Sequence, residues 1–307
     1  MVGEPVGVVI PTYNRAALLQ AALESVLVQT VPVQEIVVVD DGSTDETARV
    51  VAEFAAQGAP IRFFPGPHQN RRSLARNQGF AATSAPLVAF LDSDDLWRPA
   101  RLARQLAALA AAPAAGFAVC NLQRFDEQGL IEGPCLDPAT DYNGAILGDI
   151  LEEPRIVSST LLVRRAAFEA VGGFADLRMN EDHELTIRLA ARYPASYIPE
   201  VLVLLREHAG RTSRAARELP LSDYIHIVGD FLAAHPDLPA ATRARGRRGL
   251  ANVHLKLARF YLESGERAAA RRHVRATLGL GLWNRRTLQA ALRAWAPGRS
   301  LYPQRET

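Results

Sequence analysis

Three carboxylates lie within four residues, directly after an apolar run at residues 86–91. The run ends in Asp92, and Asp94 and Asp95 follow. On an extended backbone the side chains of Asp92 and Asp94 point the same way, because alternate residues of a strand share a face. Like charges at this spacing repel unless a cation lies between them or water screens them, and Mg²⁺ or Mn²⁺ prefers such oxygen ligands. The pattern therefore predicts either a divalent-metal site or a solvated acidic turn.

Other polar side chains also follow apolar runs. Asp40 and Asp41 come after one such run, where a carboxylate can accept hydrogen bonds from ribose hydroxyls or from a base N–H. Thr12 and Tyr13 follow another, and they either hold a base with a loop backbone and an aromatic face or only form a turn. Arg76, near the start of an expected helix, can bind phosphate or carbonyl oxygens, or form an ion pair with an aspartate.

The strands that would position these residues alternate with helices. Apolar runs predict strands at residues 6–10, 36–39, 61–64 and 87–91, and this alternation implies right-handed crossovers and a parallel sheet. Ligands of such sheets bind at the carboxyl ends of the strands. Further strands are expected at 117–120, 159–164 and 197–205, the second of them antiparallel, and further helices at 99–111, 146–151, 181–192, 221–234, 241–264 and 266–278.

Composition limits the classes of function. The chain has 307 residues, 48% of them hydrophobic, which is enough for a large α/β domain with an appendage or for two modest domains. Lys256 is the only lysine, so neither a P-loop lysine nor a Schiff-base lysine precedes it. No G-x-G-x-x-G motif follows the first strand, which argues against a dinucleotide dehydrogenase. We expect no nucleic-acid partner.

Charge is distributed unevenly along the chain. Residues 241–307 hold 15 Lys+Arg and 3 Asp+Glu, a balance of +12, whereas the rest of the chain has a balance of −10. The arginine-rich tail either docks on an anionic partner such as lipid headgroups, or it is a solvated helical appendage or a contact in a homodimer.

Cysteine usage and hydropathy predict a cytoplasmic protein, at most peripheral at the inner face of the membrane. Cys120 and Cys135 have no metal-ligand spacing, and we expect two unpaired thiols. Glu4 and Pro5 directly precede the first apolar strand, so we expect no signal peptide. The stretch 106–120 is too short and too weakly apolar to span a bilayer.

Five motifs, in order and at suitable intervals, resemble the family 2 glycosyltransferases over roughly residues 6–210. They are Val9-Ile10-Pro11-Thr12-Tyr13-Asn14-Arg15, Asp40-Asp41-Gly42-Ser43-Thr44-Asp45, Ala75-Arg76-Asn77-Gln78-Gly79, Leu91-Asp92-Ser93-Asp94-Asp95 and Asn180-Glu181-Asp182. The resemblance implies the GT-A fold, a Rossmann-like α/β architecture with a mixed, mostly parallel sheet flanked by helices. It also implies a catalytic domain over 1–213, with a nucleotide-binding half (about 1–95) and an acceptor half (about 96–213), followed by an α-helical region at 214–307.

The resemblance also implies roles for individual residues. Asp94 and Asp92 would hold Mg²⁺ or Mn²⁺ together with His208, although a surface histidine is equally consistent with the position of His208. Asp182 would be the catalytic base, or else simply an acid favoured by the helix dipole. The donor, a UDP-, GDP- or dTDP-linked sugar, would be bound by Pro11, Thr12, Tyr13, Asp40, Asp41, Arg76, Asp92 and Ser93, with Asp41 favoured over Asp40 for the nucleoside.

The expected activity is therefore inverting transfer of a sugar from a nucleotide-diphospho-sugar to an acceptor hydroxyl, in polysaccharide, glycolipid or other glycoconjugate synthesis. With this activity, docking of the arginine-rich tail on a lipid-linked saccharide acceptor is a further expectation. Two alternatives stay open. A nucleotidyltransferase also joins strand-end acids with a metal and a nucleotide, but it usually needs a Gly-rich basic loop, and residues 11–15 offer one arginine and no glycine. The other alternative is a non-catalytic subunit that binds sugar nucleotides.

Overall fold

The computed structural model describes residues 4–131, 133–208 and 218–295. The chain divides into two compact units, one formed by residues 1–150 and 154–211 and the other by residues 151–153 and 212–307. The expected domain boundary at residues 213 and 214 lies outside the described residues.

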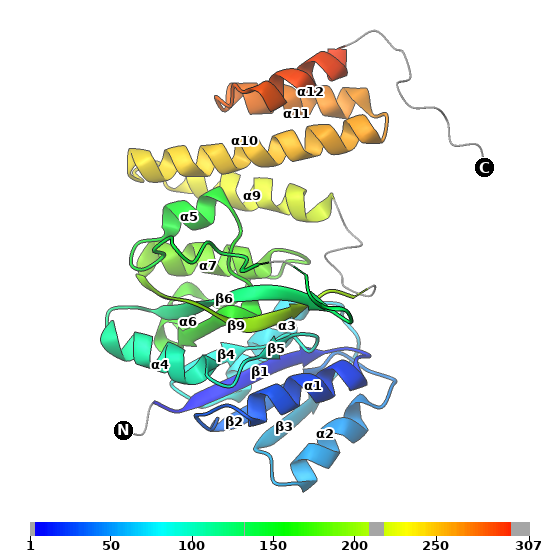
Figure 1. Cartoon of the computed structure of the whole chain (residues 1–307), viewed down its shortest axis with the longest axis vertical. Helices are drawn as coiled ribbons and strands as arrows, with labels where there is room; N and C mark the ends of the chain where they lie inside the picture. The colour runs from blue at the N-terminus through cyan, green and yellow to red at the C-terminus, as the bar shows by residue number, and fades with distance from the viewer. Residues whose placement is uncertain (1–3, 132, 209–217, 296–307) are drawn as a thin grey trace, which may run out of the picture. The chain divides into compact units, whose positions relative to one another are not determined.

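A nine-stranded sheet forms the centre of the first unit (Figure 1), and it has the mixed, mostly parallel character expected of the GT-A fold. The strand order is β3-β2-β1-β4-β8-β6-β9-β5, and β7 pairs with β6. The strands are β1 (Val6–Thr12), β2 (Glu35–Asp40), β3 (Ile61–Pro65), β4 (Leu87–Phe90), β5 (Leu96–Trp97), β6 (Phe117–Asp126), β7 (Gly129–Leu130), β8 (Leu161–Arg164) and β9 (Ala195–Arg206).

Strand directions bring several carboxyl ends to one edge. β1 pairs in parallel with β2 and β4, and β2 pairs in parallel with β3. β8 is antiparallel to both β4 and β6, as expected, and β9 is parallel to β6. The first-half strands and β9 therefore run in the same direction, and residues that follow them meet at one edge of the sheet.

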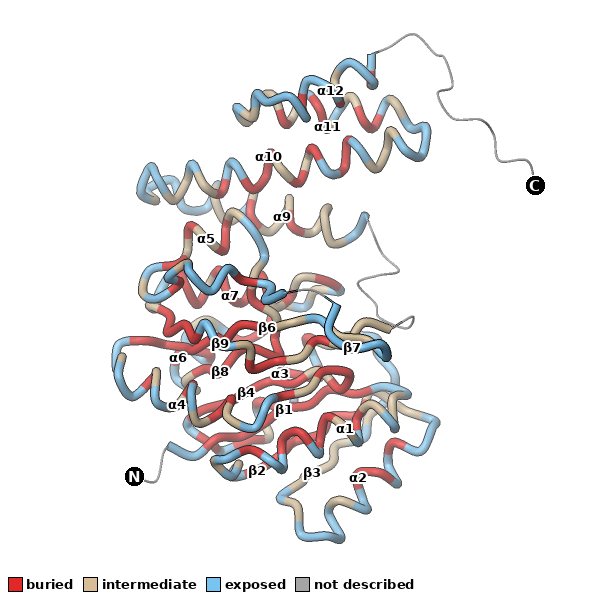
Figure 2. The backbone as a smooth tube through the Cα atoms, viewed as in Figure 1, coloured by how far each residue is buried: buried red, intermediate tan, exposed pale blue. Residues whose placement is uncertain are grey.

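Helices cover both faces of this sheet, which explains why its strands are continuous apolar runs (Figure 2). Alternate residues of β2 enter different cores: Ile36 and Val38 belong to the large core, and Val37 and Val39 pack with Ala75 on the other face. The flanking helices are α1 (Ala16–Leu27), α2 (Thr47–Ala56), α3 (Arg72–Ala82), α4 (Arg101–Ala111), α5 (Leu147–Glu152), α6 (Arg165–Val171) and α7 (Glu181–Arg192).

Helix α3 packs unusually close to β1. A Cβ atom on Gly79 would lie only 2.3 Å from the Cγ1 atom of Val9, so no larger residue fits without a shift. This contact fixes α3 against the sheet one turn after Arg76, whose side chain is buried.

The second unit is helical. It contains α9 (Leu219–Ala234), α10 (Ala240–Glu263), α11 (Arg267–Gly279) and α12 (Arg285–Trp295). The first three agree with the expected helices, whereas α12 was not anticipated. Its small core includes Leu255, Val274 and Ala290. Among the described residues, no helix has both the length and the apolar character that a membrane span requires.

Candidate active site

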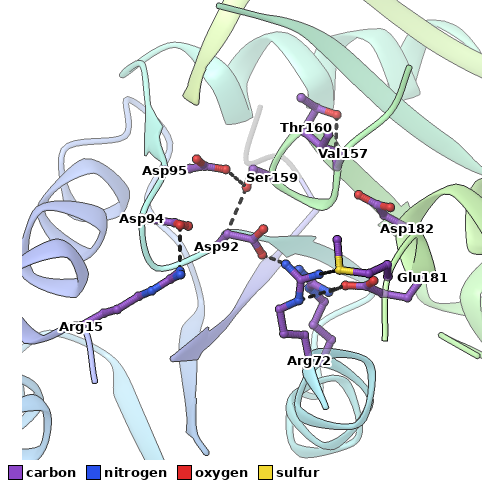
Figure 3. A network of polar contacts seen from close by, with 12 residues as sticks. Arg15, Arg72, Asp92, Asp94, Asp95, Val157, Ser159, Thr160, Glu181 and Asp182 are labelled. Atoms are coloured by element: carbon purple, nitrogen blue, oxygen red, sulfur yellow. Dashed lines mark hydrogen bonds and ion pairs between the residues drawn. The ribbon is translucent and has the colours of Figure 1, made fainter. Parts of the chain in front are cut away.

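The acidic turn after β4 brings three carboxylates together. Carboxylate oxygens of Asp92, Asp94 and Asp95 all lie within 4.8 Å of one another, and this is the only such group of three or more possible ligands among the described residues. The turn lies at the carboxyl end of β4, where open α/β sheets bind ligands (Figure 3). An all-oxygen set of this kind fits Mg²⁺ or Mn²⁺.

Asp94 shares one carboxylate oxygen between two partners. Its Oδ2 atom accepts a hydrogen bond from Nη1 of Arg15 at 2.7 Å, and Nε2 of His208 lies 3.0 Å from the same oxygen. Arg15 follows β1 and His208 follows β9, so segments from both halves of the sheet meet at this aspartate. The structure thus places both other predicted metal ligands, Asp92 and His208, close to Asp94.

Asp95 is turned toward the protein. Its Oδ2 atom accepts a hydrogen bond from the Ser159 hydroxyl at 2.6 Å, and its Oδ1 atom accepts one from the Arg206 main-chain N–H at 3.2 Å. The same hydroxyl oxygen of Ser159 accepts the N–H of Asp92 at 3.1 Å. Ser159 was not predicted as a site residue, and its one sequence signal is its position at the start of the strand that pairs with β4.

Arg76 lies between two acids and is 1% exposed. Its guanidinium forms ion pairs with Asp92 and, at 2.7 Å, with Glu181 (Figure 3). Burial alone would raise the pKa of Asp92, but the charges of Arg76 and Arg72 outweigh burial and hold that pKa below its ordinary value. Arg76 therefore adopts the ion pair that sequence analysis gave as the alternative, and its role toward a donor stays a prediction.

Asp182 lies in the first turn of α7, beside Glu181. Its Oδ1 atom accepts the N–H of His183 at 2.8 Å, and the side chain is partly buried. In Figure 3 the carboxylate points toward the side of the network on which Asp92 lies. Burial and the negative charge of Glu181 raise the pKa of Asp182 to about 6, although Arg76 and Arg72 oppose the rise. A carboxylate with this pKa can accept a proton near neutral pH.

Asp41 and Tyr13 lie against the loop that follows β3. The Asp41 carboxylate accepts the N–H groups of Gln69 and Asn70, each at 2.8 Å, and lies 3.0 Å from Nδ1 of His68. The ring of His68 stacks on Tyr13 with centroids 3.9 Å apart. Sequence reasoning missed His68, although it follows an expected strand at the same sheet edge and could have been found there.

The other predicted donor-binding residues are mostly buried. Asp40 is 5% exposed and accepts the Ser43 hydroxyl and N–H, so its carboxylate holds the turn after β2. Pro11 and Ser93 are buried within their motifs. Thr12 is 4% exposed, and its hydroxyl has no hydrogen-bond partner among the described residues, which leaves it able to bind a ligand group. The carboxylates of Asp40 and Asp41 both have partners within the protein, but the Asp41 side chain is more exposed, at 17%, and its role toward a nucleoside stays a prediction.

Three asparagines just before helices that carry or adjoin site residues adopt left-handed backbone conformations. Asn14, Asn70 and Asn180 have φ values of 49°, 54° and 57°, and they are the only non-glycine residues with positive φ among those described. They lie just before α1, α3 and α7, which carry or adjoin Arg15, Arg76 and Asp182. Asn14 also accepts the N–H of Thr44 at 2.7 Å, which joins two of the loops. Asparagine tolerates this conformation better than most residues.

Comparison with known proteins agrees with this geometry. The family model described as glycosyl transferase family 2 matches residues 7–172, more than half of the chain. An O-antigen biosynthesis protein, RfbC of Myxococcus xanthus, is 31% identical over 216 residues, which are 69% of this chain but 16% of that protein. Across other curated relatives, the chain spans between 24% and 93% of their length.

Solved structures show the same fold. TarS 1–349 of S. aureus, in complex with UDP-GlcNAc, superposes with a TM-score of 0.73 at 19% identity and covers 94% of this chain and 88% of that one. A mannosyltransferase of Pyrobaculum calidifontis, in complex with GDP-Man and Mn²⁺, gives a TM-score of 0.60 at 23% identity, with 95% and 84% covered.

Proposed function

The chain belongs to glycosyl transferase family 2, and we propose that it is an inverting enzyme that transfers a sugar from a nucleotide-diphospho-sugar to an acceptor hydroxyl. The observation that carries this proposal is the pair of ion pairs that the buried Arg76 makes with Asp92 and with Glu181, the residue before Asp182. These contacts connect the acidic turn, which is suited to a metal and a diphosphate, with Asp182, which is suited to proton transfer. Inverting transfer needs both functions in the same site.

Asp182 is the catalytic base in this proposal. Its raised pKa, about 6, matches it to accept the proton of a neutral hydroxyl, because a base works best when its pKa lies near the operating pH. The first turn of α7 also favours its ionised form through the helix dipole. Deprotonation makes the acceptor oxygen a better nucleophile toward the donor's anomeric carbon.

Asp94 and Asp92, with His208, would hold the divalent ion. The three acids of the turn and a neighbouring imidazole nitrogen form a donor set that suits Mn²⁺ or Mg²⁺. When bound, such an ion neutralises the charge that develops on the departing diphosphate. Arg15, already within 2.7 Å of Asp94, lies where it can also bind phosphate oxygens.

Asp41, Tyr13 and Thr12 would bind the nucleoside. The Tyr13–His68 stack offers an aromatic face to a base, and Asp41 lies at the end of β2, where it can accept hydrogen bonds from ribose or base. The complexes of TarS with UDP-GlcNAc and of the Pyrobaculum mannosyltransferase with GDP-Man support a nucleotide-sugar donor with either base. Ser93 and Pro11 would shape this part of the site.

The acceptor hydroxyl belongs, in this proposal, to a polysaccharide, a glycolipid or another glycoconjugate. Similarity to an O-antigen biosynthesis protein supports that class. Cys120 and Cys135 form no disulfide in the structure, which supports a reaction in the reducing cytoplasm.

A donor screen followed by a transfer assay tests the proposal. We expect a UDP-, GDP- or dTDP-sugar to raise the melting temperature only when Mn²⁺ or Mg²⁺ is present, and the product to have the inverted anomeric configuration by NMR. Retention of configuration would refute the inverting mechanism. Release of pyrophosphate from a nucleoside triphosphate would instead favour a nucleotidyltransferase, and donor binding without transfer to any acceptor of a broad panel would favour a non-catalytic subunit.

A further inference from the structure

The terminal helix α12 carries an exposed apolar strip that the proposed reaction does not use. Leu288, Leu292 and Trp295 are 51%, 74% and 43% exposed, and Trp283, just before the helix, is 69% exposed. The three helical residues are spaced by four and three positions, so they lie on one face of α12. We name these four residues the α12 strip.

The α12 strip is separate from the face of α12 that packs inside its own unit. Thr287, Ala290 and Ala294 are buried, and two of them belong to the helical core with Leu255 and Val274. Figure 2 shows buried and exposed positions alternating along this helix. Large side chains thus lie on the outside and small ones on the inside, the reverse of what packing within the unit would need.

Arginines flank the α12 strip. Residues 267–295 contain seven arginines and no aspartate, glutamate or lysine. Arg271 and Arg275 of α11 lie over the ring of Trp295, at 6.0 and 5.6 Å from its centroid. Arg285 and Arg293 are exposed on α12 itself. An apolar strip flanked by cations is complementary to a surface that has an apolar interior beneath a layer of anionic groups.

We propose that the α12 strip inserts into the surface of a bilayer that contains anionic phospholipids, with the surrounding arginines bound to the lipid phosphates. Helices that lie in a membrane interface combine leucine and tryptophan on one face with basic residues on the other. Tryptophan favours the headgroup level because its ring is apolar and its N–H is polar. Trp283 and Trp295 occupy the two ends of the strip.

A second protein chain fits this surface less well. A stable protein interface buries about 20–30 residues a side, whereas the strip has four large apolar side chains. A symmetric contact between two copies would also bring two sets of seven arginines together with no acid between them. This proposal does not depend on which sugar the enzyme transfers, because vesicle binding needs neither donor nor acceptor.

Flotation of the full chain with vesicles tests the proposal. We expect flotation with phosphatidylcholine vesicles that contain phosphatidylglycerol, little flotation with phosphatidylcholine alone, and loss of binding as salt rises. Brominated lipid should quench fluorescence of the exposed tryptophans, since the third tryptophan, Trp97, is 3% exposed in the other unit.

Two double variants separate the apolar and the charged parts. Leu288→Gln with Leu292→Gln, and Arg285→Gln with Arg293→Gln, should each weaken vesicle binding about tenfold or more. The matched controls, Leu27→Gln with Leu130→Gln and Arg49→Gln with Arg104→Gln, change exposed residues of the first unit and should bind like the wild type. All four changed positions of the test variants are exposed, and circular dichroism with thermal melting verifies that each variant folds.

Three results would overturn the proposal. The first is a wild-type chain that does not float with anionic vesicles. The second is a leucine variant that floats as the wild type does. The third is a wild-type dimer, measured by light scattering without lipid, that the leucine variant converts to monomers, because the strip would then be a contact between copies. Transfer to a soluble acceptor should be the same in all variants, so a failure here is distinct from a failure of the proposed reaction.

Discussion

Asp92 of the acidic turn and Glu181 at the start of α7 are joined by one buried guanidinium, that of Arg76. Only sixteen residues separate Arg76 from Asp92, but 105 separate it from Glu181. The contact therefore ties the first half of the sheet to the helix that carries the proposed base. Burial and the negative charge of Glu181 raise the pKa of the adjacent Asp182, against the opposing charges of Arg76 and Arg72.

Replacing Asp182 by Asn should abolish transfer but preserve donor binding. The amide keeps the size of the side chain but cannot accept the acceptor proton, and loss of a general base costs about 10²–10⁴-fold in rate. Single-turnover assays and calorimetry with the donor measure the two effects. Asp230→Asn, at an exposed position of α9, is the matched control. Undiminished turnover in the Asp182 variant would show that another group is the base.

The pH dependence of transfer should have an acidic limb near pH 6. Asp182 must be ionised to accept a proton, and burial with the charge of Glu181 raises its pKa to about 6. The rate constant kcat/KM should therefore fall about tenfold for each pH unit below that value. A profile that is flat down to about pH 5 would contradict the assignment, provided that the protein stays folded there.

The same shift predicts a trade-off between stability and activity. A pKa raised above the ordinary 3.8 means that the folded state favours the protonated acid. The contribution of this group to the free energy of unfolding is therefore fully present below pH 3.8 and is lost as the pH rises through about 6. Asp182→Asn, which is neutral at every pH, should avoid this loss. Above about pH 7 the variant should unfold with a free energy about 1–3 kcal/mol higher than the wild type. Denaturant unfolding at several pH values measures the difference, which should shrink as pH falls below about 5.

Replacing Asp94 by Asn should weaken metal-dependent donor binding. Asp94 is the acid that lies closest to both Arg15 and His208, and loss of groups that merely support metal ligands already costs about 10–100-fold in affinity. Titration of the nucleotide with Mn²⁺ and with a chelator measures the effect. Equal affinity for the donor with and without metal in the wild-type protein would contradict a metal role for this residue.

Arg76→Met should destabilise the first unit strongly. It would remove the cation that Asp92 and Glu181 share and leave the buried Glu181 with only Arg72, at 3.5 Å, and breaking a buried pair in this way costs roughly 3–5 kcal/mol. Arg71→Met is the control, because Arg71 pairs with an exposed acid, Asp176, and a pair of this kind contributes roughly 0–1 kcal/mol. Urea unfolding of both variants gives the comparison. A cost for Arg76 as small as that for Arg71 would mean that water reaches the two acids.

The central sheet could be predicted because its strands are buried on both faces and read as continuous apolar runs. Strand β5 could not, since Leu96 and Trp97 form a strand only through their pairing with β9. Helix α12 was not predicted as a separate element, although its apolar and basic residues fall on different faces, because Arg293 and its neighbours were read only as part of an arginine-rich helical tail.

The acids of the site could be found because they follow predicted strands, but their partners could not. His68 and Ser159 are ordinary loop and strand-end residues in the sequence, and only the fold brings them to Asp41 and Asp95. Arg76 illustrates the same limit. From the sequence, either a phosphate or an aspartate could be the partner of Arg76. In the structure its side chain is 1% exposed and forms the ion pair with Asp92.

Asn14, Asn70 and Asn180 hold strained backbone angles in the loops that lead into α1, α3 and α7. Glycine adopts the same backbone angles at no steric cost but adds freedom to the unfolded chain, whereas a β-branched residue would oppose those angles. The stiffness of each loop can thus be varied one position at a time, with every charged side chain of the site left in place. The mobility of these loops and the chemistry of the site are for this reason separable properties of the molecule.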